Sequence, residues 1–176
     1  LYACNPHEIQ MGILKRLRGS PIIRHTEAFD LRFNPLPPFN ILSTDRIDFN
    51  TMQRINRFAR YWDMIGNSGR FKNLLPYLLN CQDCVSPFDD FLALTDWIYK
   101  KTGQTHKINL KKLYELVAQS VYELFPIRYQ SVIKALELDY ERSKLKGSFK
   151  GLQLIAEEAM ETNLTHRANS RQQRHL

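Results

Sequence analysis

From Asp48 onward, apolar side chains recur at steps of three and four residues, and this helical period constrains the fold more than any other feature. The period stops and restarts several times before Thr162. Its interruptions are the stretch 66–69 (GNSG), Gly103 and Pro126. Glycine and asparagine adopt the left-handed conformation that ends helices, and proline removes an amide donor. The pattern therefore predicts a mainly α protein, a bundle of five or six helices.

Residues suited to start a helix precede the periodic segments. Asp48, Ser86 and Asn109 can each accept a hydrogen bond from a free amide of the first turn, and Pro87 suits the first helical position. The predicted helices run from Asp48 to Ile65, through 71–79, from Ser86 to about Gly103, from Asn109 to Pro126, through 129–140, and through 147–162. Apolar residues predicted on their inner faces include Phe49, Met52, Phe58, Trp62, Phe88, Phe91, Tyr114, Val117, Val132 and Leu136.

The first part of the chain lacks this regularity, and residues 9–22 (IQMGILKRLRGSPI) fit two patterns. As a helix, the segment places Ile9, Ile13 and Leu17 four residues apart, with a basic end that stops at Gly19. As a strand, it alternates apolar and other side chains and leads into a Gly-Ser-Pro turn. Propensity alone favours the basic helix, and the residues leave both patterns open.

Short β-like pieces and a run of prolines follow. The pieces are 21–24 and 29–33, and the run NPLPPF (34–39) is a stiff connector because each proline removes an amide donor and holds its predecessor extended. The predicted organisation is an extended region over residues 1–34, a proline-rich linker over 35–47, a helical domain over 48–162 and a flexible basic tail over 163–176.

The net charge of +7 comes from the N-terminal half of the chain and from the tail after Asn163, which has no acidic residue. Residues 1–80 hold 11 Lys and Arg against 6 Asp and Glu, whereas residues 81–176 hold 14 against 12. No run approaches the roughly 18 apolar residues of a membrane span, and the first residues do not have the charged-then-apolar pattern of a secretory leader. We therefore expect a cytoplasmic protein without a membrane partner. A basic helical module that binds RNA or DNA is the alternative function that this charge suggests.

Three groups of residues could carry chemistry, and each has an ordinary structural interpretation. Cys81 and Cys84 have the spacing of a metal or redox pair but lack further ligands. Arginines interleave with aromatic residues over 54–71, yet at helical spacing the rings fall on the apolar stripe and the arginines opposite it. The acidic runs 137–141 and 157–161 lack a histidine or nucleophile beside them, and such runs are typical of solvated helix faces. The residues alone predict no catalytic, cofactor-binding or metal site.

A resemblance to a known family gives a more specific expectation. The stretches 7–25 (HEIQMGILKRLRGSPIIRH) and 34–71 resemble the C-terminal part of cobalamin-binding radical SAM proteins. The matching exit turn of the barrel consists of Leu17, Gly19, Ser20 and Pro21. Pro37, Pro38, Ile41, Leu42 and Thr44 match the connector that follows, and residues 171–176 resemble the end of these chains.

The resemblance implies that this chain is the helical C-terminal accessory domain, with residues 1–34 as the end of the barrel. The defining C-x-x-x-C-x-x-C motif and the D-x-H-x-x-G cobalamin motif are absent from the sequence. The 4Fe-4S cluster, S-adenosylmethionine and cobalamin would therefore belong to the parent enzyme and not to these residues. The expected partners are the barrel and cobalamin domain of the parent, contacted through Arg54, Arg57, Arg60 and Arg70.

Overall fold

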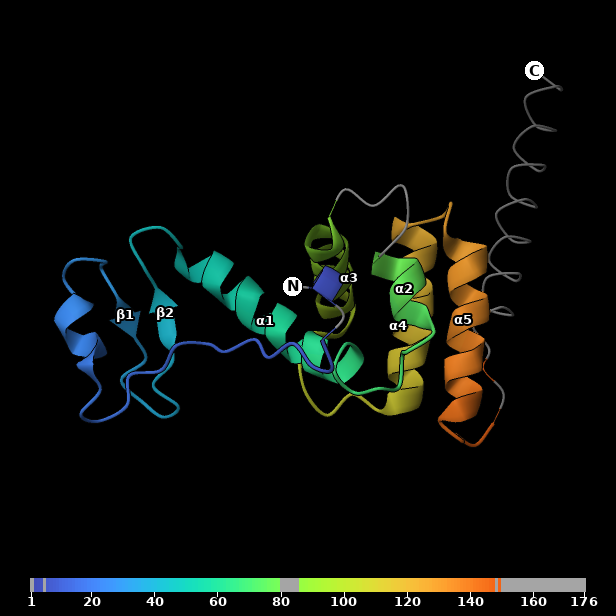
Figure 1. Ribbon diagram of the computed structural model, residues 1–176, viewed down its shortest axis with the longest axis horizontal. Coiled ribbons are helices and arrows are strands. Elements are labelled where there is room, and N and C mark those ends of the chain that lie inside the picture. Colours follow the sequence, from blue (N-terminus) through green and yellow to red (C-terminus); the bar gives the residue numbers. More distant parts are fainter. Residues whose placement is uncertain (1, 5, 80–85, 148, 150–176) are drawn as a thin grey trace, which may run out of the picture. The chain divides into compact units, whose positions relative to one another are not determined.

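The computed structural model describes residues 2–4, 6–79, 86–147 and 149 (Figure 1). Its helices are α1 (Phe49–Ile65), α2 (Leu74–Leu79), α3 (Pro87–Thr102), α4 (Leu110–Leu124) and α5 (Tyr129–Arg142), with two 3₁₀ helices, η1 (Tyr2–Cys4) and η2 (Pro21–His25), and two strands, β1 (Arg32–Phe33) and β2 (Ile41–Ser43). The predicted mainly α class with a short extended region in front is confirmed. The helix predicted over 147–162, the tail over 163–176 and both Cys81 and Cys84 lie outside the described residues.

The chain divides into two compact units. Unit 1 consists of the residues up to Gly69 together with Phe91–His106, and unit 2 consists of Arg70–Asp90 and the residues from Lys107 onward. This division does not follow the predicted linker over 35–47. That stretch contains β2, which pairs with β1, so the residues on both sides of the prolines belong to unit 1.

The predicted helix starts are confirmed in α1, α3 and α4. The Asp48 side chain accepts a hydrogen bond from the Thr51 amide (2.7 Å), and the Asn109 side chain accepts one from the Lys111 amide (2.9 Å). Ser86 accepts from the Asp89 amide at 3.4 Å. These side chains satisfy amides that have no partner inside the helix, which is why each helix begins where it does.

The cap at Asp48 predicts a pH dependence of stability. The hydrogen bond from Thr51 lowers the pKa of Asp48 below its usual value of 3.8, whereas the unfolded chain keeps the usual value. The folded state therefore gains stability from this carboxylate above the unfolded pKa, and loses it as the pH falls through the folded pKa. In urea unfolding, we expect Asp48→Asn to be less stable than the parent chain at pH 6 and to approach it at pH 3. A difference in stability between Asp48→Asn and the parent chain that stays constant with pH would contradict this prediction.

A small sheet packs on the N-terminal half of α1 in unit 1. β1 and β2 are antiparallel, with Arg32 opposite Ser43 and Phe33 opposite Ile41. On its other side, the chain around β2 pairs with the N-terminal segment through the bridge between Lys15 and Asn40. The apolar centre of this layer is Leu31, Ile41 and Met52, with Ile13, Ile22, Phe33 and Ile47 packed against it.

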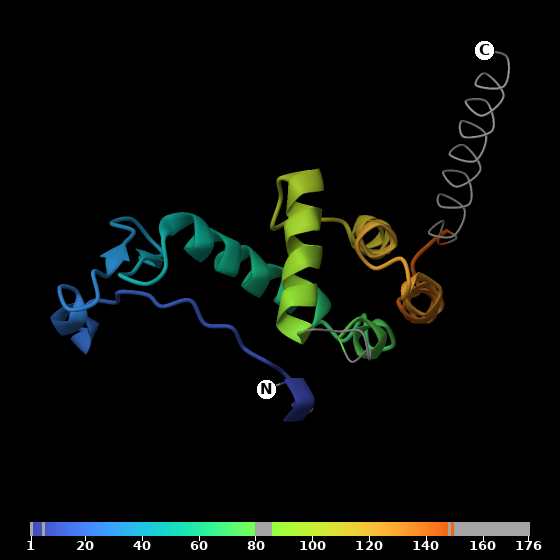
Figure 2. The ribbon, with the colours of Figure 1, turned by 90° about the horizontal axis from the view of Figure 1, so that it is seen from above.

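The structure resolves the ambiguity over residues 9–18 in favour of the extended form. No helix forms there, and Figure 2 shows the segment as an extended trace that runs along α1. Ile9, Met11 and Ile13 are half-buried while Gln10, Gly12 and Leu14 are exposed, which is the alternation of a strand.

Two β-like pieces of the sequence were predicted incorrectly. Residues 21–24 belong to η2, because the Ser20 hydroxyl accepts from the Ile22 amide and Pro21 occupies the first helical position. The strand expected over 29–33 shrinks to β1, because Asp30 has a positive φ of 42° and turns the chain just before it.

In unit 2, α5 packs against both α2 and α4. Its core contains the fully buried side chains of Leu74, Leu78, Tyr114, Val117, Val132 and Leu136. The inner faces predicted for α4 and α5 are thus confirmed. Phe49 and Phe88 are exceptions elsewhere: both were predicted inside but are 52% and 51% exposed, since each lies in the first turn of its helix. No helix in the described part of the chain is long and apolar enough to span a membrane.

Candidate functional site: a groove beside the first helix

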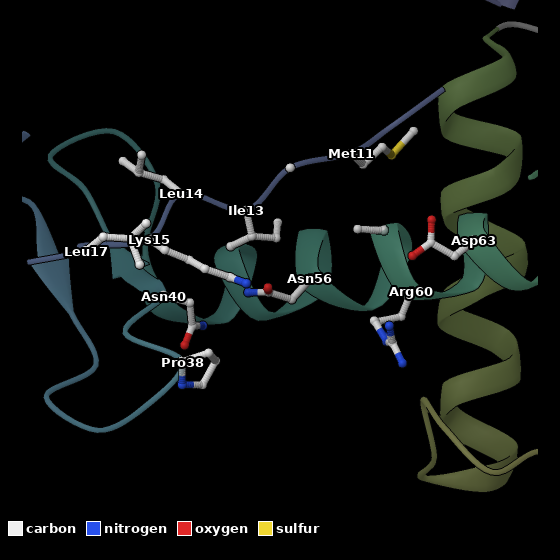
Figure 3. Close-up of a pocket in the computed structure, with 12 residues that line it drawn as sticks. Met11, Ile13, Leu14, Lys15, Leu17, Pro38, Asn40, Asn56, Arg60 and Asp63 are labelled. Carbon is white, nitrogen blue, oxygen red and sulfur yellow. The ribbon is translucent and has the colours of Figure 1, made fainter. Parts of the chain in front are cut away.

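An open groove of about 890 Å³ lies in unit 1 between the N-terminal extended segment, the loop before β2 and one face of α1 (Figure 3). Its lining combines apolar and polar side chains, namely Met11, Gly12, Ile13, Leu14, Lys15, Leu17, Pro38, Asn40, Asn56, Ala59, Arg60 and Asp63. The groove brings together Arg60 and Leu17, which the sequence had placed in two separate groups of candidates.

The extended segment supplies one wall because two anchors hold it. At one end, Lys15 is bridged to Asn40, with the Arg16 amide donating to the Phe39 carbonyl (2.9 Å) and the Ile41 amide donating to the Leu14 carbonyl (2.8 Å). These bonds direct the side chain of Lys15 to the same face as Ile13, toward α1.

At the other end, the Asn67 side chain holds the main chain of Ile9. Its oxygen accepts from the Ile9 amide (3.2 Å) and its nitrogen donates to the Ile9 carbonyl (3.1 Å). The same oxygen accepts from the Trp62 indole (3.0 Å), and the nitrogen donates to Asp63 (3.2 Å). The sequence had identified Asn67 only as part of a helix stop. Its position also fixes where the groove begins.

α1 supplies the opposite wall through Asn56, Arg60 and Asp63, which follow one another at steps of four and three residues and so share a helix face. Ala59 lies beside them and leaves room for the hollow. The Asn56 side-chain nitrogen donates to the Met52 carbonyl (2.9 Å), which fixes the carboxamide at the helix surface. Within the described residues, neither Lys15 nor Arg60 has an ion-pair or hydrogen-bond partner for its side chain.

The four arginines predicted to form one contact surface lie in different environments. Arg54 forms an ion pair with Asp96 of α3, and the guanidinium of Arg57 lies 4.4 Å from the centre of the Tyr99 ring. Arg60 lines the groove, and Arg70 is an exposed residue of unit 2. Of the four, only Arg60 lines this groove.

Leu17, Gly19 and Ser20, three of the four residues predicted as a barrel exit turn, lie in a tight turn. The Ser20 amide donates to the Leu17 carbonyl (3.1 Å), and Gly19 has a φ of 74° that favours glycine. Pro21 then starts η2. The leucine at the start of this turn is 60% exposed and reaches the end of the groove.

The aromatic residues interleaved with arginines over 54–71 point inward. Phe58, Tyr61, Trp62 and Phe71 are each at most 5% exposed, and the rings of Phe58 and Trp62 contact Phe91 in T-shaped geometry. These rings are not available to stack on bases.

Within the acidic run over 137–141, Asp139 serves the fold. Asp139 is 1% exposed and accepts hydrogen bonds from the amides of Asn73 and Leu74, at the start of α2.

Burial, followed by the charges of Tyr122 and Glu137, raises the pKa of Tyr129 to about 12, so this phenol stays protonated at neutral pH. The described residues contain no group of three or more His, Cys, Asp or Glu that could hold a metal ion.

Comparison with known proteins adds one match. The family described as "Protein of unknown function (DUF4080)" matches residues 27–175, which is most of the chain. Neither a curated protein nor a solved structure matches.

Proposed function

We propose that this chain, which belongs to the DUF4080 family, is the C-terminal accessory domain of a cobalamin-type radical SAM enzyme. In this proposal it packs on the barrel and helps to shape or cover the substrate site. The chemistry belongs to the parent, whose upstream domains hold the 4Fe-4S cluster, S-adenosylmethionine and cobalamin. Support comes from the resemblance over 7–25 and 34–71 and from one structural observation, the open edge of the N-terminal extended segment.

This edge follows from the geometry of the bridge to β2. Since the Arg16 amide and the Leu14 carbonyl bond toward residues 39–41, the N–H and C=O of Lys15 point the opposite way. Among the described residues, no backbone partner pairs with them or with Met11 and Ile13. An extended segment with free donors and acceptors on one edge is a template for another strand.

Unit 1 also exposes large apolar side chains. Those of its large hydrophobic residues that are 42–68% exposed are Leu14, Leu17, Ile23, Phe29, Leu36 and Phe49. Exposed apolar side chains that cluster in one region mark an interface more often than those that are scattered singly. A barrel that continues the sheet from residues 11–15 would pair the edge and cover these side chains.

Two measurements on the parent test the proposal. The reading frame upstream of Leu1 should encode a C-x-x-x-C-x-x-C motif. In hydrogen exchange on the complete parent, the amides of Met11, Ile13 and Lys15 should exchange at least about tenfold more slowly than in the present chain alone, because partnered amides are protected.

A matched pair of variants separates main-chain pairing from charge. Lys15→Pro removes the outward N–H and should abolish the added protection at Met11 and Ile13, whereas Lys15→Gln keeps the N–H and should leave it in place. A reading frame without the motif, or equal exchange in the parent and in this chain, would refute the proposal.

A further inference from the structure

We propose that the groove of unit 1 binds small molecules that join one anionic group, a carboxylate or a phosphate, to an apolar body. This inference rests on the groove itself and not on the proposed radical SAM parent. The volume of about 890 Å³ is within the range of small-molecule sites, and the lining has the usual mixture of apolar surface with a few polar groups.

The anionic group is assigned to the part of the groove between Lys15, on the extended segment, and Arg60, on α1. Both are cations without an ion-pair partner in the described part of the chain, and both line the same hollow. An arginine can donate two parallel hydrogen bonds to a carboxylate or phosphate, and a lysine adds a point charge. The carboxamide of Asn40 lies beside Lys15 and offers two more N–H donors (Figure 3).

The apolar body is assigned to the surface between the two walls. Ile13 points toward α1 from the extended segment in Figure 3, and Met11 and Ala59 line the same groove. Pro38 and Leu17 extend the apolar lining beyond Lys15. A chain or ring placed here would leave water on contact with these side chains, which contributes roughly 25 cal/mol for each Å² of apolar surface that is buried.

Asp63 limits the ligand to a single anionic end. Figure 3 shows it at the Met11 end of the groove, next to Arg60 and away from Lys15. Its carboxylate accepts a hydrogen bond from the side-chain nitrogen of Asn67 (3.2 Å). A second negative group at this end would meet a like charge, and the groove therefore favours a monoanionic amphiphile over a polyanion such as nucleic acid.

Three related probes test the assignment on the present chain: octanoate, octyl phosphate and neutral octanol. Titrations followed by amide NMR should show that both anions shift the signals of Lys15, Asn40, Asn56 and Arg60 in a saturable way. Octanol should bind at least about tenfold more weakly, because it lacks the charge. Raising NaCl from about 10 mM to about 300 mM screens the charges of the groove. The higher salt should weaken the binding of both anions but not the binding of octanol.

Four variants identify the residues responsible. Lys15→Gln and Arg60→Gln should each lower the affinity for octanoate by about three- to tenfold, the range expected for half-exposed charge-assisted hydrogen bonds. Arg46→Gln is the matched control, since this arginine is 87% exposed and outside the groove. Asp63→Asn should raise the affinity by about twofold or more, a gain that misfolding could not produce.

The outcomes distinguish this inference from the proposed function. Equal binding of octanol and octanoate, equal effects of Arg46→Gln and Arg60→Gln, or no gain with Asp63→Asn would each overturn it. A missing radical SAM motif upstream would not affect it. Conversely, Lys15→Gln should lose anion binding but keep the pairing of the strand edge, because this variant retains the main-chain N–H of residue 15.

Discussion

Asp139→Ala should destabilise the protein by about 3 kcal/mol or more, although sequence reasoning assigned this residue to a solvated acidic run. One carboxylate oxygen accepts from the side-chain nitrogen of Asn73 (2.9 Å), and both accept from its amide (3.1 Å). The amide of Leu74 adds a fourth contact at 2.9 Å. Removing the carboxylate leaves the amides of Asn73 and Leu74, at the start of α2, without this acceptor, and the amide of Leu74 is buried.

The thermal unfolding midpoint, followed by circular dichroism, measures this loss. At about 2–4 °C for each kcal/mol in a chain of this size, we expect a decrease of about 6–12 °C. Asp139→Asn keeps one acceptor oxygen and should lose only part of this stability. Glu141→Ala is the control, because Glu141 belongs to the same acidic run but is exposed. If Asp139→Ala and Glu141→Ala unfold at the same temperature, the capping role of Asp139 is wrong.

The helices of this protein were predictable because their signals are local. A period of 3.6 and a capping side chain such as Asp48 or Asn109 act within a few residues, so the boundaries of α1 and α4 agree with the expected ones. The role of Asp139 depends on contacts across 65 residues of sequence. The signal that could have identified it is its place on the buried face of α5, three residues after Leu136 and next to Tyr140.

The candidate site was predictable only in part, for a related reason. The arginines of α1 were predicted to lie opposite its apolar stripe, but the sequence could not reveal that Asp96 and Tyr99 would approach Arg54 and Arg57. The groove itself depends on Asn67, whose contact with Ile9 joins residues 58 positions apart. No periodicity or spacing encodes such a contact.

Arg128→Ala should cost about 3 kcal/mol, through the loss of a largely buried ion pair. Arg128 precedes α5, and its side chain is 9% exposed, while that of its partner Asp90, in the first turn of α3, is 14% exposed. The guanidinium also donates to the carbonyl of Leu78 (3.3 Å) and lies over the ring of Phe125. These contacts join the end of α2 to the starts of α3 and α5 within unit 2.

Arg128→Ala is destabilising because the negative charge of Asp90 then remains without its partner in a site with little water. Replacing both partners, in Asp90→Leu with Arg128→Met, removes both charges and should therefore be less destabilising than Arg128→Ala alone. Arg54→Ala is the matched control. Its ion pair with Asp96 involves side chains that are 47% and 33% exposed, and water and salt screen such pairs, so we expect a loss below about 1 kcal/mol.

Urea unfolding at low and high salt separates the two ion pairs. The loss caused by Arg128→Ala should change little with salt, because few ions reach the pair, whereas the small loss caused by Arg54→Ala should decrease further. Similar losses for Arg128→Ala and Arg54→Ala would show that burial does not distinguish these pairs. A double variant less stable than Arg128→Ala would show that packing around the guanidinium, and not the unpaired carboxylate, dominates the energetics of this site.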